Sequence, residues 1–158
     1  MNGPKLRTLL LIRHGETRSN REGIFRGRLE IPLSCRGEEQ ARALRKAAPV
    51  SNVVVVVCSP LQRAQATALI AFPDLSVSTN DCLHNLDLGD WSGKRKKDIQ
   101  RDFPGDWEQW IHDPHAIRFP RGESLKDVHQ RARRFLRWFQ ESAAAPMAAV
   151  THRSVIKC

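Results

Sequence analysis

The sequence predicts an α/β fold of three layers, α/β/α, with a mostly parallel central sheet and a small helical excursion over the expected site. Two short apolar runs, 9–12 and the five valines 53–57, are typical of strands buried on both faces. Segments with helical spacing of apolar residues separate the runs, which favours a parallel sheet with long crossovers. The runs end abruptly in polar residues, at the sheet edge where such folds bind ligands.

Length and charge limit the class of protein. The chain has 158 residues, so we expect one domain over 1–158. Its hydrophobic fraction of 41% and charged fraction of 27% are ordinary for a globular protein. The net charge of +9 predicts a field that attracts phosphorylated metabolites, nucleic acid or acidic membranes, without choosing among them.

The cysteines and the apolar segments indicate the cellular compartment of the protein. The four cysteines lie too far apart in sequence for a metal knuckle or a redox pair, and Cys58 in the valine run is interpreted as a buried small hydrophobe. We therefore expect a reduced, cytoplasmic protein. Residues 1–5 lack the apolar core of a signal peptide, and no segment approaches the roughly 18 apolar residues that span a bilayer. Association with a membrane is not expected.

The first half of the chain alternates between strands and helices. We expect a strand over 7–12, a polar loop over 18–34, a helix over 37–48 and a strand over 53–57. Ser34 is a suitable N-cap for the helix, and Pro49 ends it. After the valines, Ser59 can cap a second helix that runs to about residue 72, with Pro60 at its first position.

The second half contains the helical excursion. We expect a weak strand over 75–78, a loop over 83–93, short helices over 94–103 and 106–112 divided by Pro104-Gly105, and a strand over 147–150. Trp107 and Trp110 should pack the short helices onto the body. Ser124 and Asp127 form a capping-box-like start for a long helix. Two basic groups are interpreted as solvated: the helix start 94–97 and the helix face Arg131, Arg133, Arg134 and Arg137.

Three strand ends carry the residues with chemical potential. The first ends in Arg13-His14-Gly15, the second leads to Arg63, and the last ends in Thr151 and His152. For Arg13-His14-Gly15 the simplest alternative is a strand that ends in a loop whose Arg and His are merely solvated. If the ends share one edge, two arginines can hold a phosphoryl group and a neutral imidazole can attack its phosphorus. This chemistry requires no metal or cofactor, and the sequence shows no metal-ligand spacing or Walker-type glycine loop.

The order of these motifs resembles the histidine phosphatase superfamily, in its phosphoglycerate-mutase-like branch and of the small phosphatase type. The resemblance spans nearly the whole chain. It is carried by Leu11 to Thr17 with Asn20, Pro32-Leu33-Ser34 with Gly37, Cys58 to Ala64 with Thr67-Ala68, Leu88 to Trp91 with Gly93, Gly122-Glu123-Ser124 and Val150-Thr151-His152.

The resemblance implies roles for particular residues. His14 would be the nucleophile that becomes phosphorylated, and Arg13, Arg63 and His152 would line the phosphate pocket. Asn20 would help to bind phosphate. Further substrate contacts are expected from Gly15 and Thr17, and from Arg153, where many relatives carry glycine.

One position departs from the family pattern. Relatives usually carry a glutamate four residues before the glycine of the Gly-x-Trp element, where it protonates the leaving oxygen, and this chain has Asn85 there. Losing a general acid typically costs about 10²–10⁴-fold in rate. Three explanations stay open: Asp87 or another carboxylate substitutes for it; the substrate, such as an acyl phosphate or a phosphohistidine, needs no acid; or the protein binds phosphate with little turnover.

The length of the chain bears on function and assembly. Relatives normally continue past the last histidine with another helix and often a strand, so this chain is either a minimal form or lacks that part. A truncated sheet edge would favour aggregation or a dimer.

Mutases of the family are longer and close over their site, so hydrolysis of a small phosphorylated compound is favoured here. The alternative to a phosphatase is a regulatory module that binds phosphate without hydrolysing it. A third possibility, binding of nucleic acid, is supported only by the positive net charge.

Overall fold

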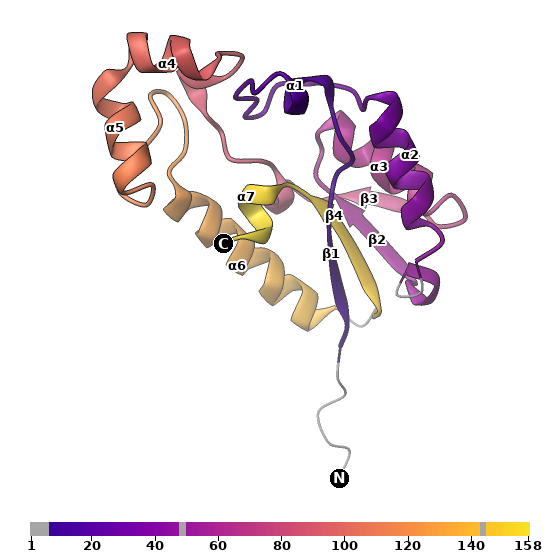
Figure 1. Cartoon of the computed structure of the whole chain (residues 1–158). Helices are drawn as coiled ribbons and strands as arrows, with labels where there is room; N and C mark the ends of the chain where they lie inside the picture. The colour runs from indigo at the N-terminus through magenta and orange to yellow at the C-terminus, as the bar shows by residue number, and fades with distance from the viewer. Residues whose placement is uncertain (1–6, 48–49, 143–144) are drawn as a thin grey trace.

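The computed structural model describes residues 7–47, 50–142 and 145–158. Four parallel strands form a sheet in the order β1-β4-β2-β3, with helices on both faces (Figure 1). The strands are β1 (Leu9–Arg13), β2 (Val55–Cys58), β3 (Val77–Thr79) and β4 (Met147–Thr151). The predicted three-layer α/β/α class is therefore confirmed.

Strand β4 is the centre of the fold. All of its residues are buried, and it pairs with β1 on one side and β2 on the other. Because side chains alternate along a strand, Met147 and Ala149 contribute to the core that includes Phe135 of α6 (Leu125–Glu141). Ala148 and Val150 contribute to the core on the opposite face, which includes the alanines of α3 (Gln62–Ala71). One strand thus anchors both helical layers.

The remaining helices are short. They are α1 (Arg18–Arg21), α2 (Cys35–Leu44), α4 (Lys96–Asp102), α5 (Pro104–His112) and α7 (Arg153–Ile156), with 3₁₀ turns at Val50–Asn52, Asp81–Leu83 and Gly89–Trp91. Helices α2 and α3 pack on each other over one face of the sheet, while α6 lies over the other (Figure 1). Helices α4 and α5 form the predicted excursion beyond the sheet edge.

Several predicted boundaries are shifted. Ser34 caps α2 as predicted, since its Oγ accepts from Gly37 N at 3.1 Å. Helix α3 begins at Gln62 after an extended Leu61, not at Pro60, and Pro104 lies at the start of α5 rather than between two helices. The polar loop contains α1, and α7 was not predicted. Helix α2 ends at Leu44 and residues 45–47 form turns, so the helix predicted to run to residue 48 is shorter; Pro49 lies outside the described residues.

An aromatic cluster attaches the excursion to the body. The fully buried ring of Trp91 lies edge-on to Phe119, with ring centroids 5.0 Å apart, and 6.0 Å from Trp107. Trp110 packs on Phe119 at 5.4 Å. The packing role predicted for Trp107 and Trp110 is confirmed.

Three further findings concern the cysteines, membrane-spanning helices and metal ligands of the described residues. All four cysteines are free, and Cys58 is fully buried as predicted. Within the described ranges, no helix is both long and apolar enough to cross a bilayer. In the same part of the chain, no three His, Cys, Asp or Glu side chains are grouped so that they could hold a metal ion.

Candidate active site

The carboxyl ends of β1 and β4 place two histidines side by side. His14 follows β1 and His152 follows β4, and the register of these strands pairs Arg13 with Thr151. The amide of His14 donates to Thr151 O at 3.0 Å. The imidazole centroids lie 5.1 Å apart. Two residues far apart in sequence therefore meet at the edge where the sequence placed them.

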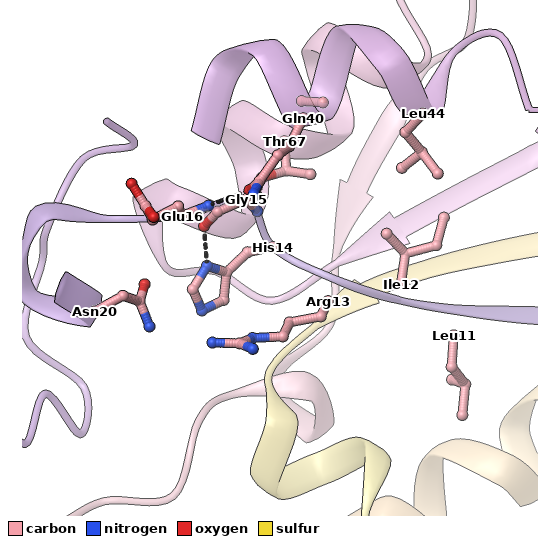
Figure 2. A pocket seen from close by; sticks show the side chains of 11 residues that line it. Leu11, Ile12, Arg13, His14, Gly15, Glu16, Asn20, Gln40, Leu44 and Thr67 are labelled. Carbon is pink, nitrogen blue, oxygen red and sulfur yellow. Dashed lines mark hydrogen bonds between the residues drawn. The ribbon is translucent and has the colours of Figure 1, made fainter. Parts of the chain in front are cut away.

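His14 is oriented as a neutral nucleophile. Its side chain is buried, and Nδ1 lies 2.6 Å from Gly15 O (Figure 2). A carbonyl can only accept, so Nδ1 carries the proton and Nε2 keeps its lone pair. Burial, followed by the charges of Arg63 and Arg13, lowers the pKa of His14 to about 4, although the bond to Gly15 opposes the shift. At neutral pH the ring is uncharged and able to attack an electrophile.

The corner after β1 requires glycine. A Cβ on Gly15 would lie 2.4 Å from Gly37 O, and a Cβ on Gly37 would lie 2.1 Å from Glu16 O. The corner and the first turn of α2 thus touch through backbone alone. The amide of Gly15 donates to Thr67 Oγ1 at 3.0 Å, so Gly15 fixes the orientation of His14 while it lines a cavity beside the ring.

Asn20 is held by Thr17. Both the amide and the hydroxyl of Thr17 donate to Asn20 Oδ1, at 2.9 and 2.8 Å. This leaves the Asn20 NH₂ group for a ligand, and Figure 2 shows Asn20 to the left of the His14 ring and the Arg13 guanidinium below it. Thr17 itself is fully buried and lines neither cavity at this edge. Its observed role is to position Asn20 rather than to contact substrate.

Arg63 lies buried behind the histidines. The guanidinium donates from Nη1 to Leu29 O at 2.8 Å and from Nη2 to Gly27 O at 3.0 Å. Its Nε has no partner within the described part of the chain. Burial and then the charge of Arg26 lower the pKa of Arg63 to about 10, so it stays cationic at neutral pH. Its charge lowers the pKa of both histidines, although Arg63 is not among the residues that line the described cavities.

His152 is almost fully buried, and Ser59 contacts it. The Nε2 atom lies 2.8 Å from Ser59 Oγ, and Nδ1 is buried without a partner among the described residues. Burial, followed by the charges of Arg63 and His14, lowers the pKa of His152, so this ring is also neutral. If the Ser59 hydroxyl donates to Nε2, Nδ1–H is available to a bound oxyanion. Ser59, predicted to cap a helix, thus orients His152.

The cavity that both histidines line has arginines and no Asp or Glu among its described lining residues. Its volume is about 410 Å³. The polar residues that line it are Arg13, His14, Ser19, Asn20, Arg26, Asn85, His152 and Arg153. The structure thus places Arg153, the residue that follows His152, at this cavity as well. Arg26 was missed by the sequence analysis, which treated 18–34 as a polar loop; only the folding of that loop over the sheet edge brings it here.

Asn85 stands at the cavity, but Asp87 does not. The amide of Asn85 donates from Nδ2 to Gly27 O at 2.8 Å, and its Oδ1 accepts from Ser154 Oγ at 2.7 Å. Asp87 accepts from Gly89 N at 3.0 Å, and its other oxygen lies 3.9 Å from an Arg28 nitrogen. Asp87 is absent from the cavity lining. The position of Asp87 therefore gives no support to the hypothesis that it substitutes for the usual acid.

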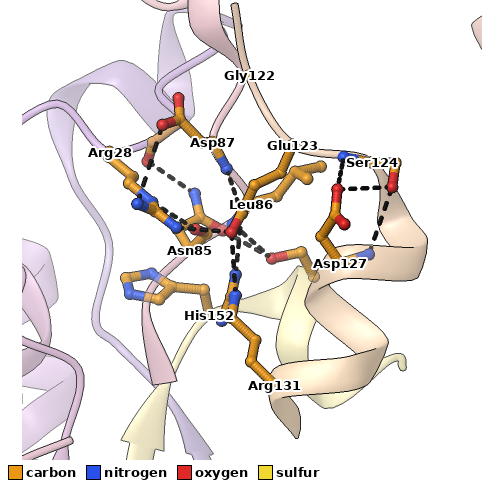
Figure 3. A network of polar contacts seen from close by, with 12 residues as sticks. Arg28, Asn85, Leu86, Asp87, Gly122, Glu123, Ser124, Asp127, Arg131 and His152 are labelled. Atoms are coloured by element: carbon orange, nitrogen blue, oxygen red, sulfur yellow. Dashed lines mark hydrogen bonds and ion pairs between the residues drawn. The ribbon is translucent and has the colours of Figure 1, made fainter. Parts of the chain in front are cut away.

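A partly buried ion network holds the loop that carries Asn85 (Figure 3). Glu123 accepts from Arg28 Nη2 at 2.7 Å and from Arg131 Nη2 at 3.3 Å. Arg131 also donates to Cys82 O at 2.8 Å and is only 5% exposed. The prediction that Arg131 belongs to a solvated face is wrong, because Glu123 and a loop carbonyl cover it. The network ties 82–89 to the start of α6.

We expect Glu123→Ala to destabilise the protein by about 3–5 kcal/mol, because it leaves Arg131 buried without its carboxylate. Urea unfolding, followed by circular dichroism, measures the change. The matched control is Glu108→Ala on α5, whose side chain is 73% exposed and, among the described residues, pairs with His112. The control should change the free energy of unfolding by less than about 0.5 kcal/mol. Equal effects of the two variants would contradict the role assigned to the network.

An all-parallel α/β fold with two neutral histidines and several arginines near one strand edge is an arrangement suited to a protein that binds and transfers phosphoryl groups. The chain belongs to the histidine phosphatase superfamily (branch 1), whose family model matches residues 9–158. The resemblance seen in the sequence motifs is thereby confirmed.

Two curated relatives and one solved structure show the extent of the similarity. The chain is 34% identical over 152 residues to an adenosylcobalamin/alpha-ribazole phosphatase of Escherichia coli, covering 94% of this chain and 74% of that protein. It is 35% identical over 130 residues to phosphoserine phosphatase 1 of Hydrogenobacter thermophilus, covering 81% of this chain and 62% of that protein. A crystal structure of a putative alpha-ribazole-5'-P phosphatase from Escherichia coli superposes with a TM-score of 0.88 at 32% identity, over 94% of this chain and 74% of that one.

Proposed function

We propose that the chain is a phosphatase that hydrolyses small phosphorylated compounds through a phosphohistidine on His14. The observation that carries the proposal is the neutral His14 ring, with its Nε2 free, in a cavity whose charged lining is cationic. The names of the relatives, phosphatases of small phosphorylated compounds, support the same reaction class. We place the protein in the cytoplasm because its cysteines are unpaired.

The reaction proceeds in two displacements. Arg13, Arg63 and His152 hold the phosphoryl oxygens, and Nε2 of His14 attacks phosphorus in line. The P–N bond forms as the bond between phosphorus and the leaving oxygen breaks. The Nδ1–H group of His14 keeps its hydrogen bond to Gly15 O during this step. Water then attacks the phosphohistidine, the P–N bond breaks, and the water proton passes to phosphate or solvent.

Asn85 supports two narrower versions of this function. An amide cannot act as a general acid at neutral pH, and Asp87 lies outside the cavity. The first version is a phosphatase for acyl phosphates or phosphohistidine, whose leaving groups need no proton. The second is a phosphate-binding regulatory module with little turnover. Nucleic acid is less favoured as a ligand than a small phosphorylated substrate. That the protein forms a dimer stays a prediction.

The proposal is tested with p-nitrophenyl phosphate under rapid mixing. We expect an initial release of p-nitrophenol that matches the amount of protein, together with an acid-labile, base-stable phosphoryl group on the chain. A comparison of aryl, acyl, phosphoramidate and alkyl phosphates then reports the dependence on leaving group. Binding of phosphate without turnover of any of these would favour the regulatory module, and an acid-stable phosphoprotein would contradict the phosphohistidine.

A further inference from the structure

The cavity beside His14 carries more positive charge than one phosphoryl group requires. Three arginines line it, Arg13, Arg26 and Arg153, and the charge of Arg63 acts from behind the histidines. Among the described lining residues there is no Asp or Glu. Because both histidines are neutral, no charge in the described lining of this cavity offsets its three guanidiniums. Two carboxylates close to the site act elsewhere: Glu30 near Arg63, and Glu16 in the neighbouring cavity beside His14. A phosphate monoester brings only about two negative charges.

Arg26 has no assigned use in binding a single phosphoryl group. It is half-buried, and its side chain makes no hydrogen bond or ion pair with any other described residue. Burial and then the charge of Arg13 lower its pKa, so the protein itself disfavours this cation. A partly desolvated guanidinium beside a second one is costly unless an anion joins them. This arrangement indicates a second anionic group on the ligand.

A larger groove meets the cavity. It is lined mainly by apolar side chains and shares four residues with the cavity: Phe25, Asn85, Leu88 and Arg153. Arg153 therefore stands where the two spaces join, next in sequence to His152. A ligand with its phosphoryl group at His14 can extend past Arg153 into the groove. The leaving group thus has a place of its own, with Arg26 and Arg153 among its neighbours.

The chemistry at position 85 limits what this leaving group is. Asn85 supplies no acidic proton, and its amide is already hydrogen-bonded to Gly27 O and Ser154 Oγ. The leaving group must depart as a stable anion. An alkoxide does not meet this requirement, whereas a phosphate does, because its last ionisation lies near neutral pH.

From these observations we infer that the substrate is a phosphoanhydride whose terminal phosphoryl group binds at His14 and whose second phosphate binds Arg26 and Arg153. The inference rests on the proposed phosphatase function. The bond between phosphorus and the bridging oxygen breaks as the P–N bond to His14 Nε2 forms, and the second phosphate leaves with the bridging oxygen and the electron pair. Water then hydrolyses the phosphohistidine, so that one water and one anhydride yield two phosphates.

The test compares inorganic pyrophosphate, glycerol 2-phosphate and p-nitrophenyl phosphate, with a chelator present. We expect kcat/KM for pyrophosphate to exceed that for glycerol 2-phosphate by about 10²-fold or more, the usual range for a missing general acid. Arg26→Gln should lower kcat/KM for pyrophosphate about tenfold more than for p-nitrophenyl phosphate, since it removes a charged contact to the second phosphate alone. Arg133→Gln is the matched control, because Arg133 is exposed on α6 and lines no described cavity.

The outcomes separate this inference from the proposed function. Turnover of p-nitrophenyl phosphate without preference for pyrophosphate, or an equal effect of Arg26→Gln on all substrates, overturns the phosphoanhydride and leaves the phosphatase standing. If nothing is turned over, calorimetry decides instead. Pyrophosphate should then bind at least about tenfold more tightly than phosphate, and Arg26→Gln should remove the difference. Equal affinities would overturn the inference.

Discussion

The His14→Ala variant is expected to lose at least about 10³-fold in kcat for p-nitrophenyl phosphate, because no other described group at the edge can take its place as nucleophile. His152 is the nearest imidazole, but its Nε2 faces Ser59. The cations stay in place, so phosphate should still bind. The variant should also carry no acid-labile phosphoryl group after incubation with substrate.

The control for His14→Ala is His112→Ala. His112 is exposed on α5 and lines none of the described cavities. Its loss should change kcat less than about twofold. Circular dichroism and phosphate binding show whether each variant is folded. A folded His14→Ala protein that releases phosphate at the unaltered rate would refute the assignment of the nucleophile.

The strand ends of the site could be predicted from the sequence because each is a local signal. An apolar run followed by charged residues marks a buried strand and its polar exit. Parallel pairing then brings such exits to one edge. His14 and His152 needed no further information, and the structure places their rings 5.1 Å apart. Ser34 was recognised as a cap for the same reason, since capping depends on the next three residues only.

The residues that were missed depend on contacts between distant segments. Arg131 was assigned to a solvated face by its chemical type, although Val128, Arg131, Phe135 and Phe139 are the buried residues of α6 and follow helical spacing. That spacing could have identified it as a buried cation. No comparable signal exists for Arg26, because its place at the cavity depends on how the loop after α1 folds.

Asn85→Glu is expected to raise kcat/KM for alkyl phosphates such as glycerol 2-phosphate by about 10²–10⁴-fold, because it supplies a proton donor at the cavity. The surroundings of Asn85 suit such an acid. Position 85 lines the cavity, and Ser154 Oγ, which donates to Asn85 Oδ1, would donate to one oxygen of a carboxyl there and leave the other oxygen to carry the proton. For p-nitrophenyl phosphate the gain should be small, since its leaving group departs without a proton.

Asn85→Gln separates acid chemistry from size, because glutamine has the length of glutamate without an ionisable proton. We expect no gain with Asn85→Gln on alkyl phosphates, and a loss wherever the longer amide displaces Gly27 or Ser154. A similar gain from both variants would mean that side-chain length, not proton donation, limits turnover. If Asn85→Glu instead lowers the preference for anhydrides as it raises alkyl turnover, the residue at position 85 selects substrates by their leaving group. The positive charge of the cavity and the lack of a general acid would then both select substrates whose leaving group departs as an anion.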